Sequence, residues 1–240
     1  MTYFGFLAWF LVIPLILVIG VTLYDRQRGR RRPAALDGLP AWLALSAHVI
    51  VALVYTTPWD NYLVATNVWW YDPDLVTGLT LGWVPIEEYT FFVLQTLLTG
   101  LWLLALARRI PTPTHPLRPH LRWISAGLVG VVWIASVVVL LSGWSPGVYL
   151  SIQLAWALPP IIFQLAFGAD ILWRYRGLVL LTLAPMTIYL GAADAVAIQA
   201  GTWTIDPAQS LEIYLGGVLP LEEFIFFLVT NTLVAFGMTL

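Results

Sequence analysis

Two acidic motifs lie within apolar sequence and could carry out acid–base chemistry. The first is Pro-Ile-Glu-Glu-Tyr at residues 85–89, followed by Phe91 and Phe92. The second is Pro-Leu-Glu-Glu-Phe at residues 220–224, followed by Phe226 and Phe227. An ionisable side chain in hydrocarbon costs about 3 kcal/mol or more, so glutamates placed this way indicate a function. We therefore expect the chemistry of the protein at Glu87, Glu88, Glu222 and Glu223.

Helix geometry restricts what each glutamate pair can do. Successive helical residues point about 100° apart, so we expect one glutamate of each pair to face a cavity. Residues four apart share a helix face, which places an aromatic ring one turn beyond each carboxyl group. The expected pairs are Glu87 with Phe91, Glu88 with Phe92, Glu222 with Phe226, and Glu223 with Phe227.

A carboxyl group in apolar surroundings is favoured in its protonated form, and two acids that share a site favour it further. Such a group can donate a proton at neutral pH. An aromatic face beside it stabilises a positive charge by roughly 0.5–2 kcal/mol. This combination suits protonation of an alkene and stabilisation of the resulting carbocation. The competing interpretation is structural, because proline followed by glutamate is also typical of a helix start.

Two aspartates and two tryptophans occupy matching places near these motifs. Asp60 and Asp194 could orient a glutamate or relay its proton, or they could cap their helix ends. Trp69 and Trp203 are expected as interfacial anchors or as the mouth of a hydrophobic tunnel. The Asp-Pro pairs at 72–73 and 206–207 are typical of turns. No metal site is predicted, because cysteine is absent and His48, His115 and His120 lack the spacing of metal ligands.

The elements that must position these residues are membrane helices. The 240 residues are 60% hydrophobic and only 10% charged, with a mean hydropathy of +0.85. That is too little polar surface to coat a soluble globule. A crossing needs roughly 20 apolar residues. Seven such spans are expected, at residues 3–24, 39–58, 78–106, 122–142, 148–170, 177–199 and 210–238.

The basic residues predict the orientation of the chain. All eleven are arginines, and they follow the first, third and fifth expected spans. Threading seven helices puts them all on one side, which is the cytoplasmic side by the positive-inside rule. The N-terminus is then outside and the C-terminus inside. The run at residues 26–32 could bind nucleic acid instead, but its place beside a span favours the membrane interpretation, so no nucleic-acid partner is expected.

A shift of about 135 residues superposes one half of the sequence on the other, with a one-residue slip before the glutamate motif. The predicted all-α fold has two three-helix repeats, at residues 1–107 and 148–240. A connector at 108–147 contains one extra helix, which returns the chain and makes the repeats parallel. Asp60 matches Asp194, Trp69 matches Trp203 and Gly82 matches Gly217, and upstream Pro14 and Asp25 fall near Pro160 and Asp170.

The duplicated Pro-x-Glu-Glu-aromatic motif and the Trp-x-x-Asp-Pro loop before it resemble the heterodimer-type carotenoid cyclases, in the form that fuses both subunits. The resemblance implies redox-neutral cyclisation of the acyclic ends of lycopene to β-ionone-type rings, without a cofactor, in a prokaryotic cell membrane. It implies that the acids and bases are Glu87, Glu88, Glu222 and Glu223, supported by Asp60 and Asp194. It leaves open β, ε or γ rings, and lycopene or a longer acyclic carotenoid. Thr204-Ile205 replaces Trp70-Tyr71 in the second loop, so the two halves need not act equally.

Other membrane functions are less well supported by the sequence. A retinal protein needs a lysine, and the chain has none. A prenyl-diphosphate transferase would need Asp-rich magnesium motifs, and a Rossmann dinucleotide site would need its glycine fingerprint; the sequence contains neither. A proton-coupled transporter or channel remains the alternative, because such proteins also use paired membrane carboxylates. A transporter requires a polar path to the glutamates, whereas a cyclase requires an apolar tunnel.

Overall fold

The computed structural model describes residues 1–33, 36, 38–111, 113 and 116–240. Within these residues, seven helical segments are long and apolar enough to cross a membrane, which confirms the expected number of spans. The segments are Tyr3–Gln27, Ala41–Ala65, Ile86–Ala107, His120–Leu141, Ser145–Arg174, Arg176–Gln199 and Leu221–Thr239.

The first segment changes its helix type at a proline. It consists of α1 (Tyr3–Leu7), the π-helical η1 (Ala8–Val12) and α2 (Ile13–Gln27), with Pro14 at the start of α2. Proline has no N–H to donate back along the helix, and π-helical turns occur where the regular bonding pattern is interrupted. The other helices are α3 (Ala41–Ala65), α4 (Ile86–Ala107), α5 (His120–Leu141), α6 (Val148–Arg174, after the 3₁₀ turn η3, Ser145–Gly147), α7 (Arg176–Gln199) and α8 (Leu221–Thr239).

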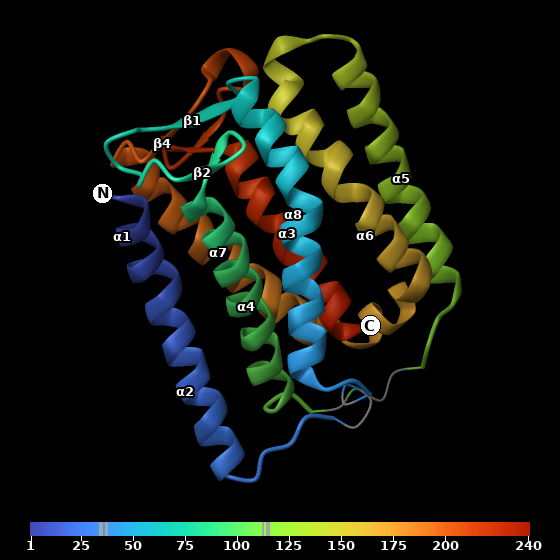
Figure 1. Ribbon diagram of the computed structural model, residues 1–240. Helices are drawn as coiled ribbons and strands as arrows, with labels where there is room; N and C mark the ends of the chain where they lie inside the picture. The colour runs from blue at the N-terminus through green and yellow to red at the C-terminus, as the bar shows by residue number, and fades with distance from the viewer. Residues whose placement is uncertain (34–35, 37, 112, 114–115) are drawn as a thin grey trace.

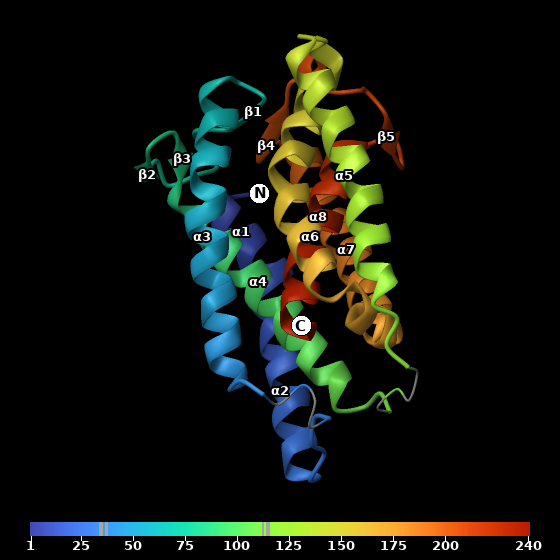
Figure 2. The ribbon, with the colours of Figure 1, turned by 90° about the vertical axis from the view of Figure 1, so that its right-hand side faces the viewer.

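Helices α4 and α8, which carry the acidic motifs, lie inside the bundle, whereas α5 lies outside against α6 (Figures 1 and 2). Polar side chains join the two inner helices. Gln95 Nε2 donates to Thr230 Oγ1 at 2.8 Å, and Thr99 Oγ1 donates to Asn231 Oδ1 at 2.8 Å. Polar groups buried among apolar helices need such partners, so these bonds fix α4 against α8.

A short ribbon joins the two halves at one end of the bundle (Figure 1). Strand β1 (Trp69–Tyr71) pairs antiparallel with β4 (Trp203–Ile205), and Trp70 faces Thr204 at the centre. Two backbone bonds flank this ladder: Asp72 N donates to Thr202 O at 3.2 Å, and Asp206 N donates to Val68 O at 2.9 Å. In the expected repeat, positions 68 and 72 match positions 202 and 206. The two bonds are therefore equivalent, as they would be if a two-fold axis passed through the centre of the ribbon.

The structure corrects the starts of two expected spans. The segments before the motifs, residues 78–85 and 210–220, are not helical, and each contains a short β-hairpin. In the first, β2 (Thr80–Leu81) pairs with β3 (Val84–Pro85); in the second, β5 (Tyr214–Leu215) pairs with β6 (Leu219–Pro220). Gly82 and Gly217 have positive φ values, which suits turns rather than helices. The glutamates therefore lie in the first turns of α4 and α8, not about seven residues inside a span. The one-residue slip falls in the second hairpin turn, which is one residue longer.

The C-terminal ends of α2 and α6 lie at the end of the bundle opposite the ribbon (Figure 1), and each carries an aspartate paired with arginine. Asp25 accepts from Arg30 Nη1 at 3.0 Å and from Arg109 Nε at 2.9 Å. Asp170, the matched residue, accepts from Arg122 Nε at 2.6 Å. The negative charge of Asp25 raises the pKa of the Arg109 guanidinium, mainly through this hydrogen bond. Each half thus has an ion pair at a matched helix end.

Candidate active site

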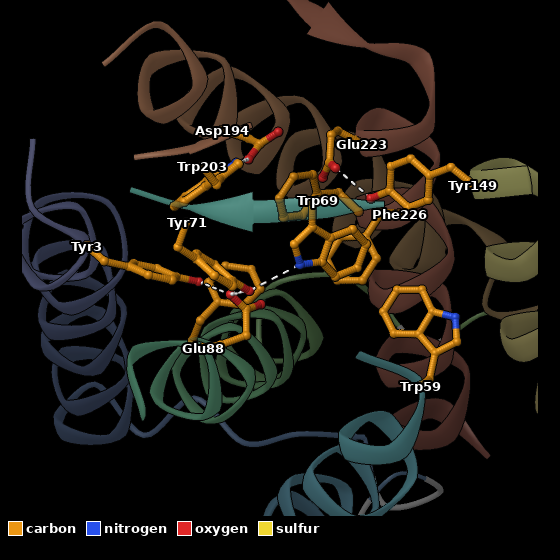
Figure 3. Close-up of a pocket in the computed structure, with 12 residues that line it drawn as sticks. Tyr3, Trp59, Trp69, Tyr71, Glu88, Tyr149, Asp194, Trp203, Glu223 and Phe226 are labelled. Carbon is orange, nitrogen blue, oxygen red and sulfur yellow. Dashed lines mark hydrogen bonds between the residues drawn. The ribbon is translucent and has the colours of Figure 1, made fainter. Parts of the chain in front are cut away.

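Glu88 and Glu223 share one pocket beneath the ribbon, and in the view of Figure 3 they lie on opposite sides of β1. The pocket is small, about 40 Å³, which is room for a water molecule or so. Most of its lining is aromatic. The lining residues are Tyr3, Trp59, Trp69, Tyr71, Glu88, Phe91, Tyr149, Asp194, Trp203, Glu223, Phe226 and Phe227.

Two tyrosines hold Glu88. Tyr3 Oη donates to Glu88 Oε2 at 2.5 Å, and Tyr71 Oη donates to the same oxygen at 3.0 Å. Tyr71 is itself fixed, because its hydroxyl oxygen accepts a bond from Trp69 Nε1 at 3.2 Å. Burial, and next the charge of Glu88, raise the pKa of the Tyr71 phenol well above its usual value. Tyr71 therefore remains a neutral donor at physiological pH.

Glu223 has one phenol partner. Tyr149 Oη donates to Glu223 Oε1 at 2.5 Å. Tyr149 stands at the start of α6, as Tyr3 stands at the start of α1, so each half supplies a tyrosine to its own glutamate. The position that matches Tyr71 is Ile205, which has no hydroxyl group. The two carboxyl groups thus have a similar framework but different hydrogen-bond environments.

The two aspartates differ in the same way. Asp194 lines the pocket, and its Oδ1 accepts from Trp203 Nε1 at 3.0 Å. Asp60 lies outside the lining, is 0% exposed, and has no hydrogen-bond partner for either oxygen among the described residues. Trp69, which matches Trp203, donates to Tyr71 instead.

Glu87 and Glu222 do not line the pocket. Glu87 Oε1 accepts from the backbone N–H of Thr77 at 2.7 Å, and Glu222 Oε1 accepts from that of Leu211 at 2.7 Å. Each bond ties the loop before a hairpin to the first turn of the helix after it. The first glutamate of each motif thus holds the loop at a helix start, as the structural interpretation expects. The second glutamate of each motif faces the pocket.

The aromatic residues form a wall beside the carboxyl groups. The Phe91 and Phe227 ring centroids are 6.2 Å apart, and those of Phe226 and Phe227 are 5.3 Å apart, both edge to face. The expected spacing of four holds for Glu223 and Phe227. In the first half Phe91, three residues after Glu88, lines the pocket, whereas Phe92 lines a neighbouring cavity.

That neighbouring cavity is larger, about 330 Å³, and is mostly apolar. It lies among α3, α4, α6 and α8, and Phe226 lines both it and the acidic pocket. Trp59 stands at the junction: its ring stacks on Trp156 of the cavity at 4.4 Å and on Phe226 at 5.9 Å. An apolar compartment therefore adjoins the two carboxyl groups.

Sequence reasoning missed the phenols and Trp59. Tyr3 and Tyr149 are 146 residues apart, the same offset that relates Pro14 to Pro160, and this signal could have identified them as a matched pair. Trp69 and Trp203, considered as interfacial anchors or as a tunnel mouth, line the pocket, while Trp70 is 42% exposed.

The structure also bears on the two Asp-Pro turns and on metal binding. Asp72 Oδ1 accepts from Asp74 N at 2.9 Å and Asp206 Oδ1 accepts from Ala208 N at 3.0 Å, which confirms the two turns. Within the described part of the chain, no group of three or more His, Asp and Glu could hold a metal. His115 lies outside that part.

Comparison with known proteins identifies the family of the chain. A family model described as lycopene cyclase matches residues 38–106 and 146–240. The chain belongs to the lycopene cyclase family. A lycopene beta-cyclase of Halobacterium salinarum is 40% identical over 239 residues, covering 100% of this chain and 95% of that protein. The resemblance expected from the sequence is thereby confirmed.

Two further relatives are longer than this chain. A bifunctional lycopene cyclase/phytoene synthase of Colletotrichum graminicola is 38% identical over 198 residues, which is 79% of this chain and 34% of that protein. One of Podospora anserina is 35% identical over 207 residues, or 82% of this chain and 35% of that protein. No solved structure matches the chain.

Proposed function

We propose that this member of the lycopene cyclase family is a membrane enzyme that closes the acyclic ends of lycopene, or of a related acyclic carotenoid, into β-ionone rings. A carboxylic acid adds a proton to the terminal double bond. The neighbouring double bond then attacks the cation and forms the ring, and loss of a proton from the ring restores an alkene. One proton enters and one leaves, so the reaction is an isomerisation. The shared pocket of Glu88 and Glu223 is the observation that carries this proposal.

Glu223 is the proton donor and Glu88 is the proton acceptor. An ionised carboxylate can only accept hydrogen bonds, and Glu88 accepts two phenols on a single oxygen. This environment suits a carboxylate that waits to take up a proton. Glu223 accepts one phenol on Oε1, and its other oxygen can carry the proton to be donated. Asp194 returns the proton between turnovers, and its position in the lining of the same pocket supports this role.

The aromatic wall shelters the cation. Phe91, Phe226 and Phe227 line the pocket, and an aromatic face stabilises a cation by about 2 kcal/mol or more where water is excluded. Trp69 and Trp203, on the paired strands β1 and β4, add to the aromatic lining of the pocket. A transporter would instead need a polar route to these carboxyl groups, and the adjoining cavity is mostly apolar.

The protein is a multi-pass membrane protein whose N-terminus is outside and whose C-terminus is cytoplasmic. The arginines that bind Asp25 and Asp170 lie at the end opposite the ribbon, as the positive-inside rule requires for a cytoplasmic face. The chain has no cysteine, so single cysteines can report sidedness. An impermeant maleimide should label Asp74→Cys in intact cells and Arg31→Cys only in lysed cells, and the reverse pattern would contradict the orientation.

Two parallel three-helix repeats, at residues 1–107 and 148–240 with a connector at 108–147, are the evolutionary basis of this site. Support comes from hydrogen bonds that recur at matched positions. Examples are Tyr3 with Glu88 beside Tyr149 with Glu223, and the loop bonds of Glu87 and Glu222.

Expression in a lycopene-accumulating bacterium tests the activity. Pigments are extracted and separated by chromatography, and the wild-type protein is expected to convert lycopene to monocyclic and dicyclic products of the same mass. A well-inserted protein that leaves lycopene unchanged would contradict the proposal.

A further inference from the structure

A tyrosine closes each of the two lateral seams between the halves of the bundle. At the first seam, Tyr55 Oη on α3 donates to the backbone carbonyl of Trp156 on α6 at 2.8 Å. At the second, Tyr189 Oη on α7 donates to the carbonyl of Phe10 in η1 at 3.0 Å. Both tyrosines occupy matched positions of the repeat, so the two contacts are counterparts.

Prolines explain why those carbonyls are free to accept. In an α-helix the carbonyl of Trp156 would accept from the N–H of residue 160, and that of Phe10 from residue 14. Both positions are proline, which has no N–H. Pro160 therefore removes the i+4 donor of the Trp156 carbonyl, as its neighbour Pro159 does for Ala155, and Pro14 removes that of Phe10. A tyrosine across the seam donates to the carbonyls of Trp156 and Phe10 instead.

The first seam has a second bond and a cavity. Trp156 Nε1 donates back to the carbonyl of Tyr55 at 3.4 Å, and the two rings stack at 5.7 Å. Tyr55 and Trp156 both line the 330 Å³ cavity, which is bordered by small Ala52. At the matched position of the second seam stands Met186, which is 6% exposed and fills the core with a longer side chain.

The cavity of the first seam runs from the outer surface toward the acidic pocket. Val51 on α3 and Phe163 on α6 line it and are 62% and 73% exposed, so it opens where the protein meets lipid. At its inner end, Phe226 and the Trp59 stack separate it from Glu88 and Glu223. Its size is within the range of about 300–1,000 Å³ that is usual for ligand sites.

We propose that the seam between α3 and α6 is the entrance and binding channel for the polyene of the acyclic carotenoid, and that the bond from Tyr55 to Trp156 is its gate. This inference rests on the proposed function. A linear, apolar chain leaves the lipid between the two helices, and its end passes Trp59 to reach the carboxyl groups. The unreacted part of the chain stays in the cavity during cyclisation. Tyr55 is a positioning residue, because it acts on entry rather than on the reacting atoms.

Filling the channel is the direct test. Ala52→Trp should block the cavity, whereas Val54→Trp adds the same side chain to α3 at a position that does not line it. In lycopene-accumulating cells, Ala52→Trp is expected to lower ring formation at least ten-fold, and Val54→Trp is expected to match the wild type. Monodisperse elution in detergent shows that each variant is folded, and Ala52→Leu serves as a smaller filling if the tryptophan variant is not.

A binding measurement separates this inference from the proposed function. The lycopene that co-purifies with the protein is measured by absorbance in a Glu223→Gln background, with and without Ala52→Trp. Loss of bound lycopene with Ala52→Trp supports the channel. Ring formation by Glu223→Gln would overturn only the assignment of the acid and would leave the channel in place. Full binding and full turnover in Ala52→Trp would overturn the channel.

The gate has its own matched pair of variants. Tyr55→Phe keeps the ring stack but removes the hydrogen bond, and is expected to change KM two- to five-fold at unchanged kcat in proteoliposomes loaded with lycopene. Tyr189→Phe, the same change at the second seam, is expected to leave both constants unaltered. Equal effects of the two substitutions would overturn the assignment of the entrance to the first seam.

Discussion

The two glutamate centres have the same framework and different details. Each glutamate that lines the pocket stands in the first turn of an inner helix and accepts a bond from a tyrosine at the start of another helix. Only Glu88 receives a second phenol, from Tyr71, because the matched position is Ile205. Two similar acid sites thus differ in their hydrogen-bond partners through one side chain, and the proposed division into a donor and an acceptor rests on this difference.

Replacing the two pocket glutamates should have the largest effect. Glu88→Gln and Glu223→Gln preserve shape but cannot transfer a proton, so each is expected to lower turnover by at least about 100-fold, the usual contribution of acid–base catalysis. Product formation from lycopene, normalised to membrane-inserted protein, measures this. Should one variant keep wild-type turnover, its half would only build the pocket, and the division into donor and acceptor would be wrong.

The first glutamate of each motif provides the contrast. Glu87→Gln and Glu222→Gln keep an oxygen that can accept the hydrogen bond from the loop N–H. Their turnover should therefore stay within about three-fold of the wild type, whereas loss of an acid or base costs at least about 100-fold. Turnover losses as large as those of Glu88→Gln would show that the pocket position does not define the acids.

Removing the loop bonds altogether should affect stability more than chemistry. Glu222→Ala leaves the N–H of Leu211 without its partner, and Glu87→Ala does the same to Thr77. Each is expected to lower the free energy of unfolding by about 0.5–1.5 kcal/mol, the net contribution of one hydrogen bond. Thermal unfolding in detergent measures the loss, with the corresponding glutamine variants as controls. Unchanged stability in the alanine variants would show that these loops are held by other contacts.

The sequence predicted the chemistry better than the position of its residues. Hydropathy correctly predicted the seven spans, and the repeated acidic motif led to the family, because long apolar runs and a duplicated motif leave clear signals in a sequence. The helix starts were misjudged because Trp83 and Val84 are as apolar as a span, whereas the turn depends on the backbone conformation at Gly82. The phenols were missed because Tyr3 is 85 residues from Glu88 and Tyr149 is 74 from Glu223. Only folding brings such pairs together.

Changing the second phenol should have a smaller effect than removing a glutamate. Tyr71→Phe removes one of two bonds to Glu88 and is expected to reduce turnover about five- to ten-fold, in keeping with about 1 kcal/mol for a single hydrogen bond. Ile205→Tyr places a phenol at the matched position near Glu223, and should also slow the reaction by favouring the ionised form of the donor. Turnover is compared with that of Ile205→Phe, which adds a ring without a hydroxyl. Equal rates for the two changes at position 205 would mean that the asymmetry of the phenols is without consequence.

The smallest expected effect is the pH dependence of stability that Tyr71 contributes. Burial raises the pKa of its phenol in the folded protein, whereas the unfolded chain releases this proton near pH 10. Above about pH 10 the unfolded state therefore binds fewer protons, so the stabilisation is complete below that pH and falls as the pH rises through the pKa of the folded state. Between about pH 8 and 10.5, the wild type should lose more thermal stability than Tyr71→Phe, while Tyr214→Phe, at an exposed tyrosine, should behave like the wild type. If Tyr71→Phe shows the same alkaline loss as the wild type, the Tyr71 phenol is not held neutral beside Glu88, and the bond that distinguishes the two centres would lose its basis.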